Sequence, residues 1–334
     1  YGDHRDLHSF PTRRSSDLQG DPRIARIGVE EGIEWFGESR IDNIIRLRKG
    51  GIDKKIMQIR SPQISEIVKT VKYSDCAVLT EIDVAKLLSK EAKRQGKKFH
   101  VLLMVEMGDL REGIMPENVV EFSKEILKMD NIEIIGIGTN LGCLGGVIPT
   151  KEKMEKLLEI RDELEDNGII IEIISGGATD TLYLFENNEI RGINQLRIGE
   201  AIFLGRDTTN NRIIPYLRND AFKIRAEIIE IKEKPSRPYG KIGRDAFGNI
   251  PEFEDLGLRK RAILAIGKEE IDFQSIIPID KDIRILGGSS DHTVVDITDS
   301  KIDYRVGDLV EFYPLYPSLM KSFISKNIKK RIKI

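Results

Sequence analysis

Residues 173–206, IISGGATDTLYLFENNEIRGINQLRIGEAIFLGR, decide the fold of this chain. The stretch contains two small-residue motifs, Ser175-Gly176-Gly177-Ala178-Thr179 and Arg197-Ile198-Gly199-Glu200, and each follows a short apolar run that is typical of a β-strand. Glycines in such turns let backbone N–H groups approach an anion closely, and a helix that begins near Thr179 adds its positive end. Two turns of this kind, late in a repeated strand–helix pattern, match the place where βα barrels bind phosphate. The stretch therefore predicts a phosphorylated ligand.

Composition is that of an ordinary globular protein. The 334 residues suffice for one large and one smaller domain, and 53 basic side chains nearly cancel 55 acidic ones. No net field therefore favours nucleic acid or an anionic membrane, and no apolar run is long enough to span a bilayer. Two cysteines, Cys76 and Cys143, are too few for a disulfide framework, and we expect Cys143 to be buried. We expect a cytoplasmic enzyme with neither nucleic acid nor membrane as partner.

Strand and helix patterns alternate from Asp21 onward. Asp21 is suited to cap a first helix with Pro22 at its first position, and Gly32 follows its end. Further helices show apolar faces over 64–71 and 154–164. We expect seven barrel strands, at residues 35–37, 55–59, 77–79, 99–106, 132–138, 169–174 and 194–198. The pattern predicts an α/β fold, a (β/α)8 TIM-like barrel over residues 19–217.

The first 18 residues, YGDHRDLHSFPTRRSSDL, do not fit this pattern. Their sequence resembles translated adapter read-through, or else a disordered end, and we exclude them from the fold as a non-native or disordered head. A barrel needs eight strands, and the strand and helix that are missing would take roughly 30–40 residues at this place. We therefore expect a truncated chain that lacks barrel strand one.

Residues 218–334 change to a β pattern. Phe222, Ile224, Ala226 and Ile228 alternate with charged side chains, which is typical of a half-buried strand. Similar runs follow at 261–266, 282–286, 292–297 and 309–312. We expect a C-terminal all-β domain that caps the barrel mouth.

A barrel of this kind followed by a β-domain resembles the alanine racemase family, whose barrel binds pyridoxal 5'-phosphate (PLP). Eight short motifs in order carry the resemblance: GDPRIA (20–25), FGESRIDNI (36–44), MGDLREGI (107–114), GTNLGC (138–143), ISGGAT (174–179), QLRIGEAIFLG (195–205), GSSDHTVVDIT (288–298) and VGDLVEFYPLY (306–316). The resemblance implies PLP-dependent amino-acid racemisation by a homodimer in which each site borrows β-domain residues, with no metal. The ornithine-type branch is the nearest, so the expected reaction converts L-ornithine to D-ornithine, with alanine or another amino acid as the alternative.

The resemblance also implies roles for barrel residues near the cofactor phosphate and ring. Thr179 matches a phosphate-binding hydroxyl, supported by Ser175, Gly176 and Gly177 and by the backbone of Gly199 and Glu200. A helix N-cap is the other interpretation of Thr179, and both can hold together. Arg197 matches the arginine that faces the pyridine nitrogen and keeps it unprotonated, with an ion pair at the strand end as the alternative.

Five further residues are implied around the substrate and the cofactor. Arg111 matches an arginine near the substrate carboxylate, unless it only pairs with Glu112, and Asn140 replaces a histidine that alanine racemases carry beside the ring. Asp291 matches a residue that the partner subunit presents at the entrance, where a carboxylate suits the distal ammonium of ornithine or lysine; turn capping is its other interpretation. His292 is placed beside Asp291 as its brace, and Tyr316 is placed near the phosphate, with an aromatic core position as the alternative.

The residue that should attach PLP is absent. Family members form a Schiff base with a lysine a few residues before the segment that matches Gly20, but the first lysine in this chain is Lys49. Lys54 and Lys55 open a later strand and are expected to be solvated. We therefore expect the chain as given to be inactive. A non-catalytic PLP-binding protein remains an alternative, although such carriers lack a β-domain, and so does an unrelated barrel that binds a sugar phosphate.

Overall fold

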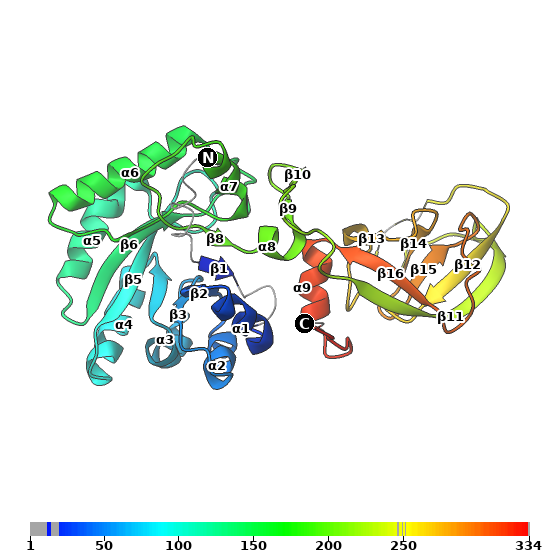
Figure 1. Cartoon of the computed structure of the whole chain (residues 1–334), viewed down its shortest axis with the longest axis horizontal. Coiled ribbons are helices and arrows are strands. Elements are labelled where there is room, and N and C mark those ends of the chain that lie inside the picture. The colour runs from blue at the N-terminus through cyan, green and yellow to red at the C-terminus, as the bar shows by residue number, and fades with distance from the viewer. Residues whose placement is uncertain (1–11, 15–19, 246, 249, 251, 333–334) are drawn as a thin grey trace. The chain divides into compact units, whose positions relative to one another are not determined.

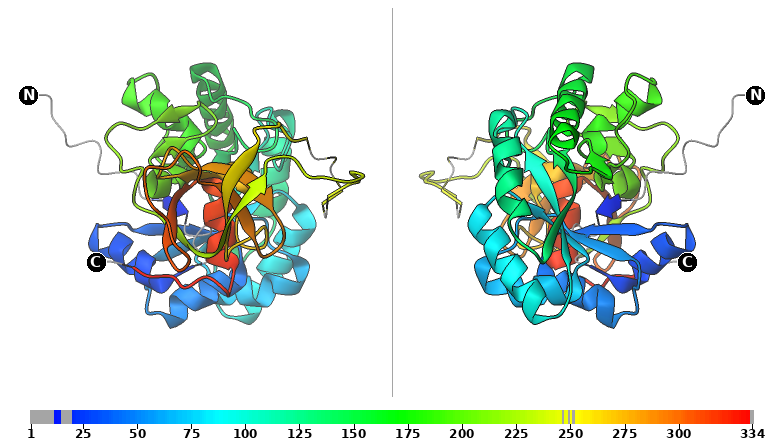
Figure 2. Two further views of the ribbon diagram at one scale, coloured as in Figure 1. Left: turned by 90° about the vertical axis from the view of Figure 1, so that its right-hand side faces the viewer. Right: turned by 90° about the vertical axis from the view of Figure 1, so that its left-hand side faces the viewer.

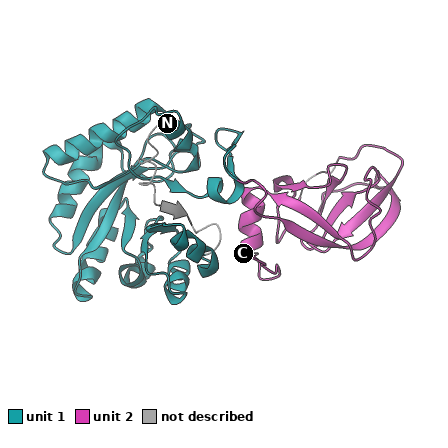
Figure 3. Ribbon diagram, in the orientation of Figure 1, with its two compact units in different colours: residues 1–217 teal, residues 218–334 magenta. Residues whose placement is uncertain are grey.

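The computed structural model describes residues 12–14, 20–245, 247–248, 250 and 252–332. They belong to two compact units that divide between Leu217 and Arg218 (Figures 1 and 3). The strands of the first unit are β1 (Thr12–Arg14), β2 (Trp35–Glu38), β3 (Lys55–Gln58), β4 (Cys76–Leu79), β5 (Phe99–Val105), β6 (Ile132–Thr139), β7 (Ile173–Ser175), β8 (Arg197–Ile198), β9 (Arg206–Asp207) and β10 (Arg212–Ile213). Its helices are α1 (Pro22–Glu30), α2 (Ile41–Lys49), α3 (Ile67–Tyr73), α4 (Ile82–Arg94), α5 (Val119–Leu127), α6 (Lys151–Asp166), α7 (Leu182–Glu186) and α8 (Glu200–Leu204), with short 3-10 helices η3 (Ile64–Glu66), η4 (Pro116–Asn118) and η5 (Thr179–Thr181).

Parallel strands of the first unit form the (β/α)8 barrel that the sequence predicts. The hydrogen-bonded order is β7-β6-β5-β4-β3-β2-β1-β8. A parallel bridge between Ser175 and Gln195, just before β8, joins the two ends of this order. The right-hand view of Figure 2 shows the helices of this unit around its strands. Asp21 caps α1 as expected, because its side chain accepts a hydrogen bond from the Arg23 backbone N–H.

A short strand occupies the position of barrel strand one, which the sequence analysis expected to be empty. Thr12–Arg14, which the sequence analysis excluded with the head, forms β1 and pairs in parallel with both β2 and β8. Unpaired backbone groups at the facing edges of β2 and β8 favour an added strand, whatever its side chains. Three residues are too few to show a periodic pattern, so no pattern in the sequence indicated β1. The rest of residues 1–18 lies outside the described part of the chain.

The barrel strands are buried on both faces. On β5, Val101, Leu103 and Val105 belong to the cluster that includes apolar residues of the helices. The alternate residues Leu102 and Met104 belong to a second cluster, together with Met57, Ile59, Cys76, Val78 and Ile135. Successive side chains of a strand point to opposite faces, so one set packs against helices and the other fills the barrel interior.

The second unit is built on an antiparallel six-stranded sheet in the order β13-β16-β11-β12-β15-β14. Its strands are labelled in Figure 1. Its elements are β11 (Ile224–Pro235), β12 (Leu258–Leu264), η6 (Phe273–Ser275), β13 (Ile276–Pro278), β14 (Arg284–Gly288), β15 (Thr293–Asp296), β16 (Leu309–Pro314) and α9 (Tyr316–Ile324). On β11, Ile224, Ala226 and Ile228 are buried while Arg225 and Glu227 are exposed, as the alternation predicts. Neither β13 nor α9 was predicted from the sequence. Among the helices of the described ranges, none is long and apolar enough to cross a membrane.

Candidate cofactor-binding site

The predicted barrel residues lie where the parallel strands β6, β7 and β8 end. Asn140 directly follows β6, Ser175 is the last residue of β7, and Arg197 lies on the two-residue β8. The carboxyl ends of parallel strands meet at one edge of the barrel, which is the active-site face of this fold. The fold therefore brings together residues that are far apart in the sequence.

Arg197 is a buried cation at the centre of this group. Only 4% of the residue is exposed, and its guanidinium donates to the Thr139 carbonyl, to the Ser175 hydroxyl and, at 2.7 Å, to Asn140 Oδ1. All three of these acceptors are uncharged. A planar guanidinium held by three fixed acceptors keeps one orientation. Arg197 is thus suited to face a ring nitrogen.

Glu112 joins Arg111 to the same group. Asn140 Nδ2 donates to Glu112 Oε1 at 2.7 Å, and Arg111 donates to both oxygens of the Glu112 carboxylate. The Arg111–Glu112 contact that the sequence analysis weighed is therefore present, and it forms part of a chain that reaches Arg197 through Asn140. Arg111 keeps 30% of its side chain exposed, so its guanidinium is accessible to a further anion.

The phosphate-binding loop predicted at residues 175–179 has the tight backbone that its glycines suggest. Gly177 has φ of +119°, and a Cβ atom added there would lie 2.5 Å from Thr181 Oγ1. The Thr181 hydroxyl in turn donates to the Gly176 carbonyl at 2.9 Å. A side chain at position 177 would therefore meet both a strained backbone and a collision.

Thr179 connects this loop to the second motif. Its hydroxyl oxygen accepts a hydrogen bond from the Ala201 backbone N–H at 3.2 Å, in the first turn of α8, and Gly199 caps that helix. No hydrogen bond to the backbone of η5 itself is among the contacts of Thr179, so the N-cap interpretation has no support here. The Glu200 side chain accepts from the backbone and hydroxyl of Thr208. What Glu200 offers at the loop is thus its backbone.

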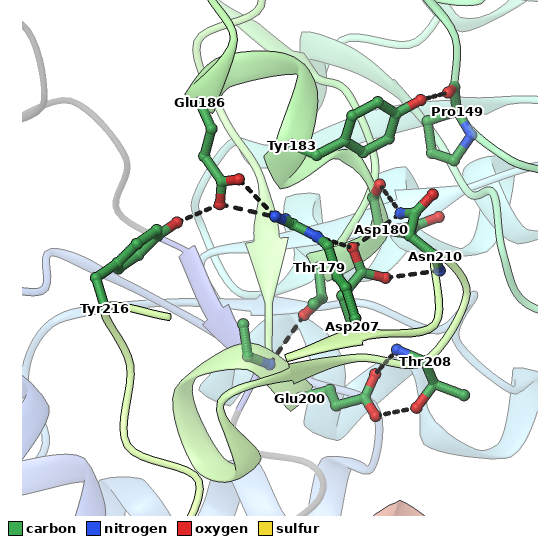
Figure 4. A network of polar contacts seen from close by, with 12 residues as sticks. Pro149, Thr179, Asp180, Tyr183, Glu186, Glu200, Asp207, Thr208, Asn210 and Tyr216 are labelled. Carbon is green, nitrogen blue, oxygen red and sulfur yellow. Dashed lines mark hydrogen bonds and ion pairs between the residues drawn. The ribbon is translucent and has the colours of Figure 1, made fainter. Parts of the chain in front are cut away.

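A polar network continues from this loop to the end of the barrel domain (Figure 4). Tyr216 donates to Glu186, Arg212 binds both Glu186 and Asp207, and Asn210 Nδ2 donates to Asp207 at 2.8 Å and to the Asp180 carbonyl at 2.9 Å. The network ties the β9–β10 hairpin to η5 and α7. Asp180, 4% exposed, directly follows Thr179. Burial, and then the negative charge of Asp207, raises the pKa of Asp180 to about 7.

The residues present fit the phosphate and ring-nitrogen ends of PLP. A glycine loop with positive φ, a buried hydroxyl at Thr179 and an oriented buried cation at Arg197 lie at one end of the barrel. They do not show a covalent attachment point. Lys49 ends α2 with an exposed side chain, and Lys55 begins β3, at the opposite end of that strand from the site.

The other predicted residues lie in the second unit or outside this group. Asp291 and His292 lie in the turn between β14 and β15, where Ser290 donates to Asp291, and Tyr316 is the first residue of α9. Their roles stay predictions. Cys143 is exposed, so the expectation that it is buried was wrong; its backbone N–H and that of Leu144 bind the buried Asp109 in a loop that stays at the surface.

Sequence reasoning missed Asp180 and Asp207 and gave Glu112 only as a surface partner. An acidic residue after a glycine turn is read first as a cap, and Asp207 lies on a two-residue strand that has no pattern of its own. In the described ranges, no group of three or more histidine, cysteine or acidic side chains could hold a metal ion.

Comparison with known proteins places these features in one family. The family model for the alanine racemase N-terminal domain matches residues 19–207. A lysine racemase of Thermotoga maritima is 49% identical over 93% of this chain and 87% of its own length, and an ornithine racemase of Acetoanaerobium sticklandii is 45% identical over 90% and 85%. Among solved structures, alanine racemase from Streptomyces lavendulae superposes with a TM-score of 0.75 at 15% identity, covering 97% of this chain and 90% of that one, and alanine racemase from Clostridium difficile 630 with 0.70 at 18%, covering 96% and 88%. The chain therefore belongs to the alanine racemase family of PLP-dependent amino-acid racemases.

Proposed function

We propose that the barrel binds PLP and serves the racemisation of a diamino acid, with ornithine as substrate and lysine as the close competitor. The observation that carries this proposal is the buried Arg197 guanidinium, oriented by Asn140 and Ser175 beside the glycine loop that ends in Thr179. Two relatives over most of the chain act, by their names, on lysine and on ornithine, both of which carry a terminal amine.

Each residue of the site has a role that follows from its contacts. PLP, when bound, supplies an electron-withdrawing ring that acidifies the α-hydrogen of an attached amino acid. Thr179 and the Gly199–Glu200 backbone hold the phosphate, and Arg197 faces the ring nitrogen and keeps it free of a proton, since two cations do not share one site. Arg111 takes the substrate carboxylate in place of Glu112, a pairing that suits its planar fork.

Three substrates and one variant test this proposal. The full chain is titrated with PLP, monitored by absorbance, and the product of L-ornithine, L-lysine and L-alanine incubations is resolved by chiral chromatography. We expect PLP to bind, and Arg197→Leu to weaken its binding about tenfold or more, because hydrogen bonds to a charged group are worth about 1.5–3 kcal/mol. Exposed Arg218→Leu, in the other unit, is the control. Equal affinity of both variants for PLP would contradict the proposed place of the cofactor.

A second candidate function is PLP binding without catalysis. It is favoured by the position of Lys55, which begins β3 at the end of that strand away from the site. Borohydride treatment of the PLP-loaded chain followed by peptide mapping tests it. We expect no single lysine to be modified stoichiometrically and no D-ornithine to form. Turnover by the chain would contradict both this candidate and the expectation that the chain is inactive.

We also propose that the chain acts as a homodimer in the cytoplasm. Support comes from the family resemblance, in which a carboxylate at the position of Asp291 reaches the partner's substrate entrance and a tyrosine at the position of Tyr316 approaches the phosphate. Light scattering on the full chain tests the dimer. Asp291→Asn is expected to raise the KM for ornithine more than that for alanine in any catalytically competent form, since alanine has no distal ammonium.

A further inference from the structure

The Asp180 side chain lies where three loops of the barrel unit meet. Its Oδ1 accepts a hydrogen bond at 3.2 Å from the backbone N–H of Ala178, within the phosphate-binding loop. A Cβ atom added to Gly142, in the loop after β6, would lie 2.5 Å from Asp180 Oδ2 and 2.6 Å from Thr209 Oγ1. The carboxyl group is therefore enclosed on the side away from Ala178.

One oxygen of this carboxyl group lacks a partner. Asp180 Oδ2 is buried and accepts no hydrogen bond from any residue that the structure describes. A carboxylate oxygen in such a place is costly when it is charged, and it costs much less when it carries a proton. Geometry alone thus favours the neutral form of Asp180.

The charged groups that face Asp180 strengthen this preference. Asp207 on β9 is 1% exposed and is itself tied to Arg212, so its negative charge stays close to Asp180. Tyr183 on α7 is neutral, because burial raises its pKa. Arg197 on β8 is the facing cation, and its guanidinium donates hydrogen bonds to Thr139, Asn140 and Ser175. Burial and Asp207 outweigh Arg197, so the pKa of Asp180 rises to about 7.

We propose that Asp180 is a positioning residue of the phosphate-binding loop that holds a proton on Oδ2 whenever a phosphorylated ligand is bound. The inference rests on the proposed function, which places the cofactor phosphate at Thr179, the neighbouring residue. A phosphate dianion beside two buried carboxylates would be repelled by both. A proton taken from solvent onto Asp180 Oδ2 removes one of these charges, while Oδ1 still accepts from Ala178 and holds the loop. Affinity for the phosphate group therefore falls as pH rises and this proton is lost.

The first test compares the affinity for PLP of wild type, Asp180→Asn and Asp166→Asn between about pH 6 and pH 8.5. Asp166, at the exposed end of α6, is the matched control for the change in net charge. We expect wild type and the Asp166 variant to bind PLP about tenfold more weakly at the upper pH. A factor of about ten corresponds to repulsion between the phosphate and one ionised carboxylate, that of Asp180. The affinity of the Asp180 variant for PLP should change little with pH, apart from the change that ionisation of the PLP phosphate itself causes. The amide keeps the Ala178 contact and does not ionise.

The second test needs no variant. PLP binding to wild type is measured by calorimetry in two buffers that differ in ionisation enthalpy. Near pH 8, binding should be accompanied by the uptake of up to one proton by the protein. Near pH 6, no such uptake is expected, because Asp180 already carries the proton. Parallel pH curves for wild type and Asp180→Asn, or no proton uptake by wild type, would overturn the inference and leave the proposed function intact. If neither protein binds PLP even near pH 6, both fail.

Discussion

At the scale of single residues, Asp180 makes the stability of the barrel depend on pH even without a ligand. Its pKa is raised from 3.8 to about 7 in the folded chain, so folding favours the protonated form. Below about pH 4 both states hold the proton and no penalty exists. Between about pH 4 and pH 7 the unfolded chain loses its proton first, so the free energy of unfolding falls, by up to about 4 kcal/mol at 1.36 kcal/mol per unit.

Urea denaturation of wild type and Asp180→Asn measures this effect. As pH rises from 4 to 7, we expect the free energy of unfolding of wild type to fall relative to that of Asp180→Asn. Above about pH 7.5 the difference between the two proteins should stay constant. The Asp166→Asn variant should follow wild type throughout. A difference that does not depend on pH would mean that Asp180 is ionised in the folded chain at neutral pH.

The residues of the site differ in how far the sequence could reveal them. Gly177, Thr179 and Arg197 stand in local motifs, and the structure gives them the tight loop and the fixed guanidinium that the motifs suggest. The neighbours that make Glu112 and Asp180 informative are distant in the chain. Glu112 meets Asn140 across 28 residues, and Asp180 is enclosed by Gly142, so only the closed barrel brings them together. A local sequence pattern does not reveal contacts between residues so far apart in the chain.

At the scale of elements, Gly136 and Gly138 of β6 set how closely β7 can pack. A Cβ atom at Gly136 would lie 2.4 Å from the Ile173 carbonyl oxygen, and one at Gly138 would lie 2.9 Å from Ser175 Cβ. Because β7 ends in Ser175, which binds Arg197, the spacing of these two strands also positions the site.

Gly136→Ala is therefore expected to destabilise the chain by about 1–3 kcal/mol, the usual cost of overpacking a closed interior. The Cβ would collide with backbone, which cannot move aside as a flexible side chain could. Gly243→Ala is the control, because an added Cβ there meets no described atom within 4 Å and its backbone is not strained. Equal denaturation midpoints for the two variants would mean that β7 moves freely away from β6.

The elements show where local pattern suffices. The bounds of strands β2 to β6 were predicted to within one or two residues. Runs such as Phe99–Val105 are apolar on both faces and long enough to be recognised as buried strands. Four strands were not predicted: β1 and β13 have three residues each, β9 and β10 have two each, and all four are defined by the ladder they join. Their backbone pairing, rather than their side chains, decides their structure.

At the scale of the whole molecule, each unit contains its own hydrophobic core. The core of the second unit is formed by β-domain residues alone. Among them are the fully buried Ile228, Leu264, Val295, Val310 and Phe312. The barrel clusters contain residues of the first unit only. A domain with its own core can in principle fold alone.

We therefore expect residues 218–334, expressed as a separate chain, to unfold cooperatively. About 117 residues lie within the usual size range of an independent domain, and the six-stranded sheet contains no strand of the barrel. Circular dichroism during urea denaturation, with the full chain measured in parallel, provides the test. The Val310→Ala variant of the fragment is the control for a native core, because truncating a fully buried valine should lower the midpoint of the same transition. A broad transition that Val310→Ala leaves unchanged would show that the second unit needs the barrel to fold. The loss of two buried methyl groups destabilises a chain only if its core is packed.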